Sequence, residues 1–302
     1  MKKDLIDATD RVLKTILGRT WTDLFFRPSL VLVVIFSYIF YAAYYIYRVH
    51  THSLTSSDPD VLLGDTFILL IGSLVIVLIV VILMFGNTAH EKHESALRKD
   101  MIEYVKVRQD DDSCDVSSTI SDLIAIDESI ADLKNRKKDT HNLLFILMVA
   151  IVFILLSLIP NMGLYQEVFM ILNYLLTICI VMVALPSLST FLADHEKGTV
   201  KFCDKLCEIS DVLGLGVVSL DVKIIDIPMK KYRIYAIATL GVFGIYWLIR
   251  IFAIRNKHYM EQWYFEDCLF ISLEEHMVEK IDSFEDDDGD VITYPGVGIQ
   301  ML

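Results

Sequence analysis

The chain has 302 residues, 54% of them hydrophobic, a mean hydropathy of +0.50 and a formal net charge of −13. The negative charge argues against a nucleic-acid-binding protein, which needs a basic face. The apolar residues gather in long runs without the polar face that helices of soluble proteins carry. This pattern predicts an all-α, polytopic helical membrane protein with the lipid bilayer as its surroundings and the cell membrane as its location.

The first segment, 1–28, precedes the apolar runs and mixes charges with apolar residues at helical spacing. Its apolar members are Leu5, Ile6, Leu13, Ile16 and Leu17. We expect an amphipathic helix lying on the inner surface of the membrane. A solvated leader is the alternative interpretation of the same pattern.

Four apolar stretches follow, each about long enough to cross a hydrocarbon core. They are Ser29–Tyr47, Gly64–Phe85, Asn142–Ile159 and Tyr165–Leu185. They predict two transmembrane hairpins, over 29–86 and 142–186. The segments between and after them, 87–141 and 187–231, are rich in charged residues and are predicted to be cytoplasmic helices.

Basic residues set the expected orientation, because lysine and arginine collect on the cytoplasmic side. Segments 1–28 and 87–141 are rich in them, whereas the turn Pro160–Leu164 has none. We therefore expect a cytoplasmic N-terminus.

A fifth apolar stretch, Ile234–Ile254, lies within segment 232–257 and has basic residues on both sides. Because both flanks are typical of the cytoplasmic side, the stretch is either a re-entrant hairpin bent near Gly241–Gly244 or a fifth span that departs from the charge rule. The hairpin would keep the C-terminus cytoplasmic, with a helix over 258–282 and an acidic tail over 283–302.

Part of this region resembles a known family. The residues Thr239-Leu240-Gly241-Val242-Phe243-Gly244-Ile245-Tyr246-Trp247, with Arg250 and Asn256 downstream, are similar to an uncharacterised prokaryotic membrane-domain family with a Thr-Leu-Gly-x-x-Gly-x-Tyr-Trp core. The resemblance covers about Lys230–Leu273, and Phe243 stands where that family has tyrosine. It implies a prokaryotic source and membrane association, and no activity.

A short pattern recurs three times after apolar stretches. It begins with His90-Glu91-Lys92, with His195-Glu196-Lys197 and with His258 followed by Glu261. Eleven positions after each histidine stands an apolar residue, namely Met101, Leu206 and Leu269. Three helical turns return that residue to the histidine's face of the helix. The pattern indicates a repeated helical unit, and chance similarity is the alternative.

Histidine and glutamate side chains near these patterns are the candidates for a metal site: His90, His93, Glu94, His195 and His258. Residues three or four positions apart share a helix face, as a metal site requires. The spacing is not that of the His-Glu-x-x-His zinc proteases. The interpretation that we favour is that these histidines mark the interfacial ends of helices, with a metal or proton-sensing site as the alternative. We predict no metal ligand, no cofactor and no catalytic residue, and keep these five residues as the candidates.

The predicted function is a non-enzymatic scaffold or partner-binding subunit, with a protein partner on the cytoplasmic helices and a homo-oligomer as one possible assembly. It depends on an apolar stripe that includes Ile120, Leu123 and Ile130 and is interrupted by Asp127. The alternative is an oligomeric channel or transporter subunit. No phosphate-binding loop, nucleophile elbow or dinucleotide fingerprint occurs.

Overall fold

A computed structural model describes residues 2–21, 59–112, 116–136, 165–216, 227–239 and 242–288. These residues form α1 (Lys2–Leu17), the short 3₁₀ helix η1 (Gly18–Trp21), α3 (Pro59–Asp112), α4 (Ser117–Arg136), α6 (Tyr165–Leu213), α7 (Met229–Ala238) and α8 (Val242–Asp288). The prediction of an all-α fold is confirmed.

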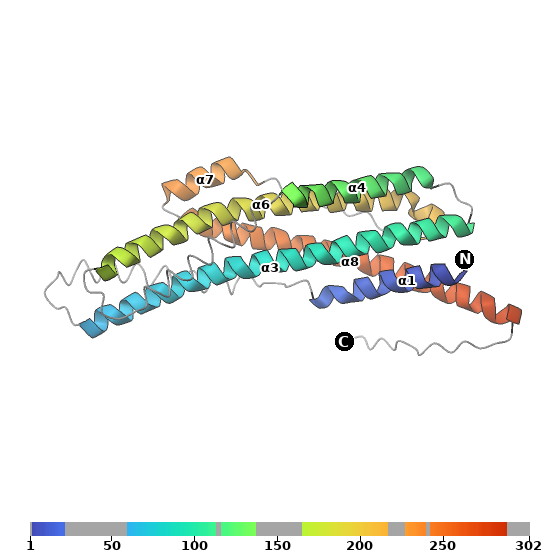
Figure 1. Ribbon diagram of the computed structural model, residues 1–302, viewed down its shortest axis with the longest axis horizontal. Coiled ribbons are helices and arrows are strands. Elements are labelled where there is room, and N and C mark those ends of the chain that lie inside the picture. Colours follow the sequence, from blue (N-terminus) through green and yellow to red (C-terminus); the bar gives the residue numbers. More distant parts are fainter. Residues whose placement is uncertain are drawn as a thin grey trace.

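Three long helices, α3, α6 and α8, run lengthwise through an elongated bundle (Figure 1). In one half of the bundle α4 packs on α3 and α6, and α1 packs on α3 and α8. In the other half the short α7 packs on α6 and α8. Because each long helix continues through both halves, side chains on the inner faces near the middle of the three helices meet between the two cores.

The bundle has two apolar cores, one in each half. The core beside α1 and α4 includes Met101 of α3, Leu206 of α6 and Leu269 of α8, each at most 1% exposed. The core near α7 includes Leu83, Leu185 and Trp247 from the same three helices. The three apolar residues of the repeated pattern thus lie in one core, as positions on the inner faces of packed helices do.

Segment 1–28 begins with α1, whose apolar residues recur at helical spacing. Leu5, Ala8, Val12 and Ile16 are 0–6% exposed and belong to the first core. The apolar face of α1 is therefore covered by α3 and α8, and this packing accounts for the amphipathic pattern of the segment.

The expected boundary between 86 and 87 lies inside the continuous helix α3, and that between 186 and 187 lies inside α6. Segment 232–257 is not one continuous helix: α7 ends at Ala238, and α8 begins at Val242. After the break α8 packs back against α7, with the ring of Tyr232 5.1 Å from that of Phe243 and 5.6 Å from that of Trp247.

The predicted membrane spans need correction. Among the residues that the structure describes, no helix combines the length and the apolar character needed to cross a membrane. The structure thus contradicts the prediction of a polytopic, multi-pass protein of the cell membrane with cytoplasmic termini, and it gives no support to a prokaryotic source. The apolar stretches Gly64–Phe85 and Tyr165–Leu185 are instead parts of α3 and α6.

The physical reason for the error is helix packing. Val77, Val80 and Leu83 of α3 and Ala184 and Leu185 of α6 are 0–1% exposed, because α3, α6 and α8 bury them against one another. An apolar helix can be covered by other apolar helices as well as by lipid, and sequence hydropathy does not separate the two cases. The stretches Ser29–Tyr47 and Asn142–Ile159, and residues 289–302 of the acidic tail, lie outside the described residues.

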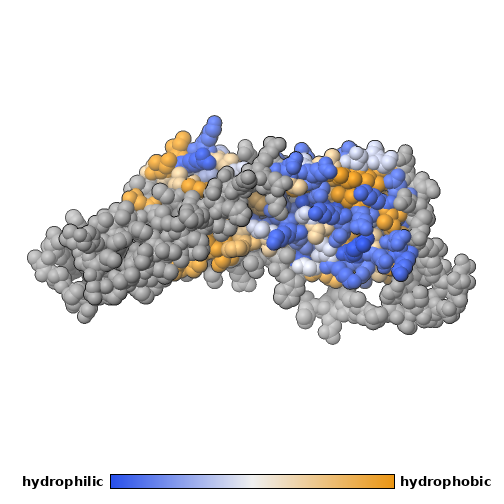
Figure 2. Space-filling model, in the orientation of Figure 1, coloured by the Kyte–Doolittle hydropathy of each residue, from blue (hydrophilic) through white to orange (hydrophobic). Residues whose placement is uncertain are grey.

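The surface differs between the two halves. Figure 2 shows mostly hydrophilic side chains over the half that contains α4, and hydrophobic patches nearer α7. Exposed apolar residues near α7 include Ile234, Ile237 and Tyr246.

Candidate metal centre

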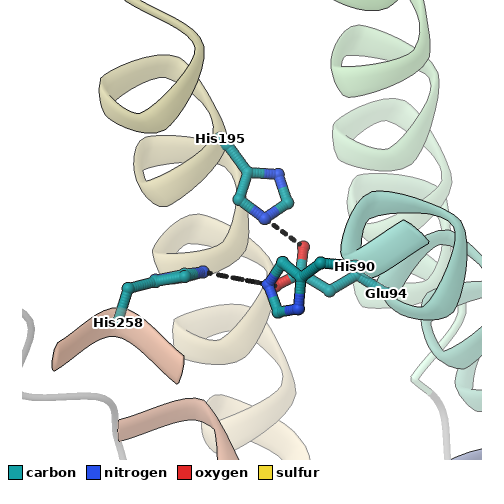
Figure 3. Close-up of side chains that lie close together, drawn as sticks. All are labelled: His90, Glu94, His195 and His258. Carbon is teal, nitrogen blue, oxygen red and sulfur yellow. Dashed lines mark hydrogen bonds and ion pairs between the residues drawn. The ribbon is translucent and has the colours of Figure 1, made fainter. Parts of the chain in front are cut away.

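A buried polar cluster separates the two apolar cores. It consists of His90 and Glu94, one turn apart on α3, His195 on α6 and His258 on α8, and we call it the His–Glu cluster (Figure 3). The four residues are only 1–6% exposed. On each long helix the cluster residue falls between the stretch that contributes to one core and the stretch that contributes to the other.

Three atoms of the cluster form a nearly equilateral triangle. The Nε2 atoms of His90 and His258 are 3.4 Å apart. Oε1 of Glu94 lies 3.4 Å from the first nitrogen and 3.6 Å from the second. All three atoms are of the types that borderline transition metals bind.

His195 completes the cluster from the α6 side. Its Nε2 lies 2.9 Å from Oε2 of Glu94, and one ligand atom from each of the four residues can be chosen so that all lie within 4.8 Å of one another. Figure 3 shows the His195, His258 and His90 rings pointing toward the Glu94 carboxylate from three different helices. The cluster therefore offers four donors, three nitrogens and one oxygen.

The two oxygens of Glu94 have different surroundings. Oε2 accepts hydrogen bonds from Oγ1 of Thr199 at 3.0 Å and from Nη1 of Arg98 at 3.3 Å. Oε1 is fully buried and accepts no hydrogen bond of normal geometry. Since a buried carboxylate oxygen without a partner is costly, Oε1 is the atom that a cation would satisfy.

The spacing of the triangle indicates the coordination geometry. Zinc bonds of about 2.0–2.1 Å place the ligand atoms of a tetrahedron about 3.3–3.4 Å apart. In an octahedron with bonds of about 2.1 Å, neighbouring ligand atoms are only about 3.0 Å apart. The three edges of the triangle, 3.4–3.6 Å, lie closer to the tetrahedral value than to the octahedral one, and the four ligand atoms lie within 4.8 Å of one another.

The protonation states also suit a metal. Burial alone would raise the pKa of Glu94, but His195, His258 and His90 hold it well below its ordinary value. Burial lowers the pKa of His258, and Glu94 opposes this only in part. At neutral pH the cluster thus presents an ionised carboxylate and a neutral His258 imidazole, the forms that bind metals.

His93, the remaining candidate from the sequence, lies in a different contact. Its Nε2 is 3.3 and 3.4 Å from the two carboxylate oxygens of Glu266. Gln262 donates to Glu266 Oε1 at 2.8 Å, and Arg19 lies 3.6 Å from Oε2. Because these partners occupy the carboxylate, His93 and Glu266 belong to a separate buried polar network next to the His–Glu cluster.

Sequence reasoning included all four members of the cluster among its candidates, and the structure brings them together while leaving His93 outside. It missed Arg98 and Thr199, the two side chains that hold Oε2 of Glu94. Arg98 follows Glu94 by four positions, a spacing that predicts a contact on a helix. No sequence signal links Thr199 to Glu94, because the two residues lie 105 positions apart on different helices.

A small cavity of about 20 Å³ adjoins Glu94, with room for one water-sized molecule. Arg98, Met101, Thr199 and Cys203 are among its lining residues. Burial raises the pKa of the Cys203 thiol, which keeps this group protonated and weakly reactive. The cavity is too small for an organic substrate.

No match was found when the chain was compared with known protein families, with curated proteins and with solved structures. The resemblance over Lys230–Leu273 therefore stays a prediction.

Proposed function

We propose that this protein binds a tetrahedral divalent metal ion, zinc in the first place, at the His–Glu cluster, and that the ion fixes α3, α6 and α8 relative to one another. The protein would then be a non-enzymatic helical scaffold with a structural metal. The observation that carries this proposal is the triangle of His90 Nε2, His258 Nε2 and Glu94 Oε1, with edges of 3.4–3.6 Å. His195 supplies the fourth donor.

A structural role fits the number of donors. Structural zinc sites use four protein ligands, whereas catalytic sites use three and keep one position for water or substrate. With His195 as the fourth ligand, all tetrahedral positions come from the chain. The adjoining cavity of about 20 Å³ also leaves no space for a substrate beside Glu94.

The ion would stabilise the bundle by connecting helices that are distant in sequence. His90 and His258 are 168 positions apart, so the unfolded chain does not hold the ligands together. An ion that binds only the folded state stabilises it by about 2.7 kcal/mol when its concentration is one hundred times its Kd.

The experiment uses the full chain, freed of metal with a chelator and then titrated with Zn²⁺ and with Co²⁺. We expect one equivalent of metal to bind, the strong visible absorption of tetrahedral Co²⁺ to develop, and the midpoint of thermal unfolding to rise. His258→Ala should abolish all three effects. His276→Ala, on the same helix and outside the cluster, is the matched control and should preserve them.

Failure of the wild-type chain to bind either ion would refute the proposal. Equal binding by the wild-type chain and His258→Ala would also refute it, because the ion would then lie elsewhere. The protein partner on the helices and the homo-oligomer stay predictions.

A further inference from the structure

One buried arginine connects the His–Glu cluster to α4, a helix that supplies no metal ligand. Arg98 is 5% exposed. Its Nε donates to Oδ1 of Asp127 on α4 at 2.8 Å, and its Nη1 donates to Oε2 of Glu94 at 3.3 Å. The guanidinium therefore lies between the proposed metal ligand and a carboxylate on α4.

Arg98 donates one hydrogen bond to Asp127 and one to Glu94, and this arrangement determines which oxygen of Glu94 stays available. A guanidinium tends to bind a carboxylate through two parallel hydrogen bonds, one to each oxygen. Here Asp127 takes the Nε donor, and Arg98 reaches only Oε2 of Glu94. As a result Oε1 keeps its lone pairs for the metal.

Charge acts in the same direction. Arg98 places a positive charge beside a site that must accept a cation, and Asp127 neutralises it at short range. Loss of the Asp127 carboxylate would leave an unbalanced positive charge next to the site and would free Nε of Arg98. Both effects would oppose metal binding.

Close packing sets the position of Asp127. A Cβ atom at Gly198 of α6 would lie 2.7 Å from Cγ1 of Ile130, so α4 and α6 approach closely at this point. Ile130 is one turn from Asp127 on α4, and Gly198 precedes Thr199, the other donor to Glu94 Oε2. The packing of α4 thus places Asp127 against Arg98 and lies next to the second support of Glu94.

We propose that Asp127 is a positioning residue for the metal site: it holds the guanidinium of Arg98 to a single hydrogen bond with Glu94, so that docked α4 determines metal affinity. This inference rests on the proposed function, since it concerns the same site. By linkage, metal binding also stabilises the docked position of α4.

The test measures the Zn²⁺ affinity of the full chain by competition with a chelating dye. Asp127→Ala should weaken binding by about 10- to 100-fold, the range for loss of a group that supports a metal ligand. Asp122→Ala is the matched control. It removes another α4 carboxylate, which lies 3.4 Å from Lys205 and is 56% exposed, and should change the affinity by less than about threefold.

A double variant separates control of Arg98 from a general effect on the fold. In Arg98→Met/Asp127→Ala the competing guanidinium is absent, and most of the affinity lost in Asp127→Ala should return. A merely structural role of Asp127 would not be rescued in this way. Asp127→Asn, which can still accept a hydrogen bond but lacks the charge, provides the measurement if Asp127→Ala does not fold, and it should also weaken binding.

Hydrogen exchange gives a second measurement. The amides of α4 should exchange more slowly with Zn²⁺ present in the wild-type chain and in Asp122→Ala, and less so in Asp127→Ala.

Wild-type affinity in Asp127→Ala would overturn this inference and leave the proposed function intact. Equal affinities of Asp127→Ala and the double variant, both below wild type, would overturn it as well. A wild-type chain that binds no metal would overturn the proposed function and this inference with it.

Discussion

The hydrogen bond from Thr199 to Glu94 offers a sharp test of the buried cluster in the metal-free protein. Thr199→Val keeps the shape of the side chain and removes the hydroxyl that donates to Oε2 at 3.0 Å. Thr199 is 6% exposed, and the adjoining cavity has room for one water-sized molecule, so a single water is the most that can replace the lost donor.

The magnitude follows from the remaining partners of Oε2. A hydrogen bond to a charged group contributes about 1.5–3 kcal/mol to stability. Arg98 at 3.3 Å and His195 at 2.9 Å stay next to the same oxygen, which places the loss near the lower end. We expect the free energy of unfolding to fall by about 1.5–2 kcal/mol.

The assay is urea unfolding of metal-free protein at neutral pH, with Thr190→Val as the control. Thr190 is also on α6, and its hydroxyl donates to the carbonyl of Pro186 at 2.9 Å within the same helix. The control should change the free energy of unfolding by less than about 1 kcal/mol. If Thr199→Val were no more destabilised than Thr190→Val, Glu94 would not depend on this donor and the described geometry of Oε2 would be wrong.

Three further predictions concern stability. The pKa of His258 is lowered in the folded state, so the unfolded state takes up the proton first as pH falls below about 6.5. Metal-free protein should therefore become less stable below that pH. In urea unfolding at a series of pH values, His258→Gln should reduce this loss of stability. Gly198→Ala should destabilise the wild-type chain by up to about 2 kcal/mol, because the new methyl group clashes with Ile130. In an Ile130→Ala background the clash is absent, and the same substitution should stabilise the protein by about 1 kcal/mol through the higher helix propensity of alanine. An effect of the same sign in both backgrounds would contradict the described packing. Trp247→Phe should cost about 1–3 kcal/mol in thermal unfolding because its indole N–H donates to buried Ser189 Oγ at 2.9 Å, and an unchanged midpoint would argue against that bond.

The sequence by itself determined the helical class and the inner faces of the helices. Helical spacing identified the apolar face of the first helix, which was expected to lie on the membrane surface, and the stripe that includes Leu123, which was expected to bind a partner. In the structure both lie in the core of the bundle. It also placed Met101, Leu206 and Leu269 on the same faces as three histidines, and all three are at most 1% exposed. Periodicity is a local property of the chain, so it can be recognised without knowing which helices meet.

What covers the described side chains of the stretches in α3 and α6 was decided only by the tertiary structure. Leu83 and Leu185 belong to stretches that hydropathy assigned to the membrane, and other helices of the bundle bury both. Hydropathy measures the transfer of a side chain out of water and carries no information on whether lipid or protein replaces the water.

The candidate site was likewise predicted in part from the sequence and decided in part by the packing of the helices. Residue type and local pattern proposed His90, Glu94, His195 and His258 as candidates. They also proposed His93, which lies between His90 and Glu94 in the sequence and is buried as well. Only the packing of α3, α6 and α8 turns the first four toward one point and turns His93 toward Glu266. Such convergence depends on the rotation and offset of each helix relative to its neighbours, which spacing along a single helix does not specify.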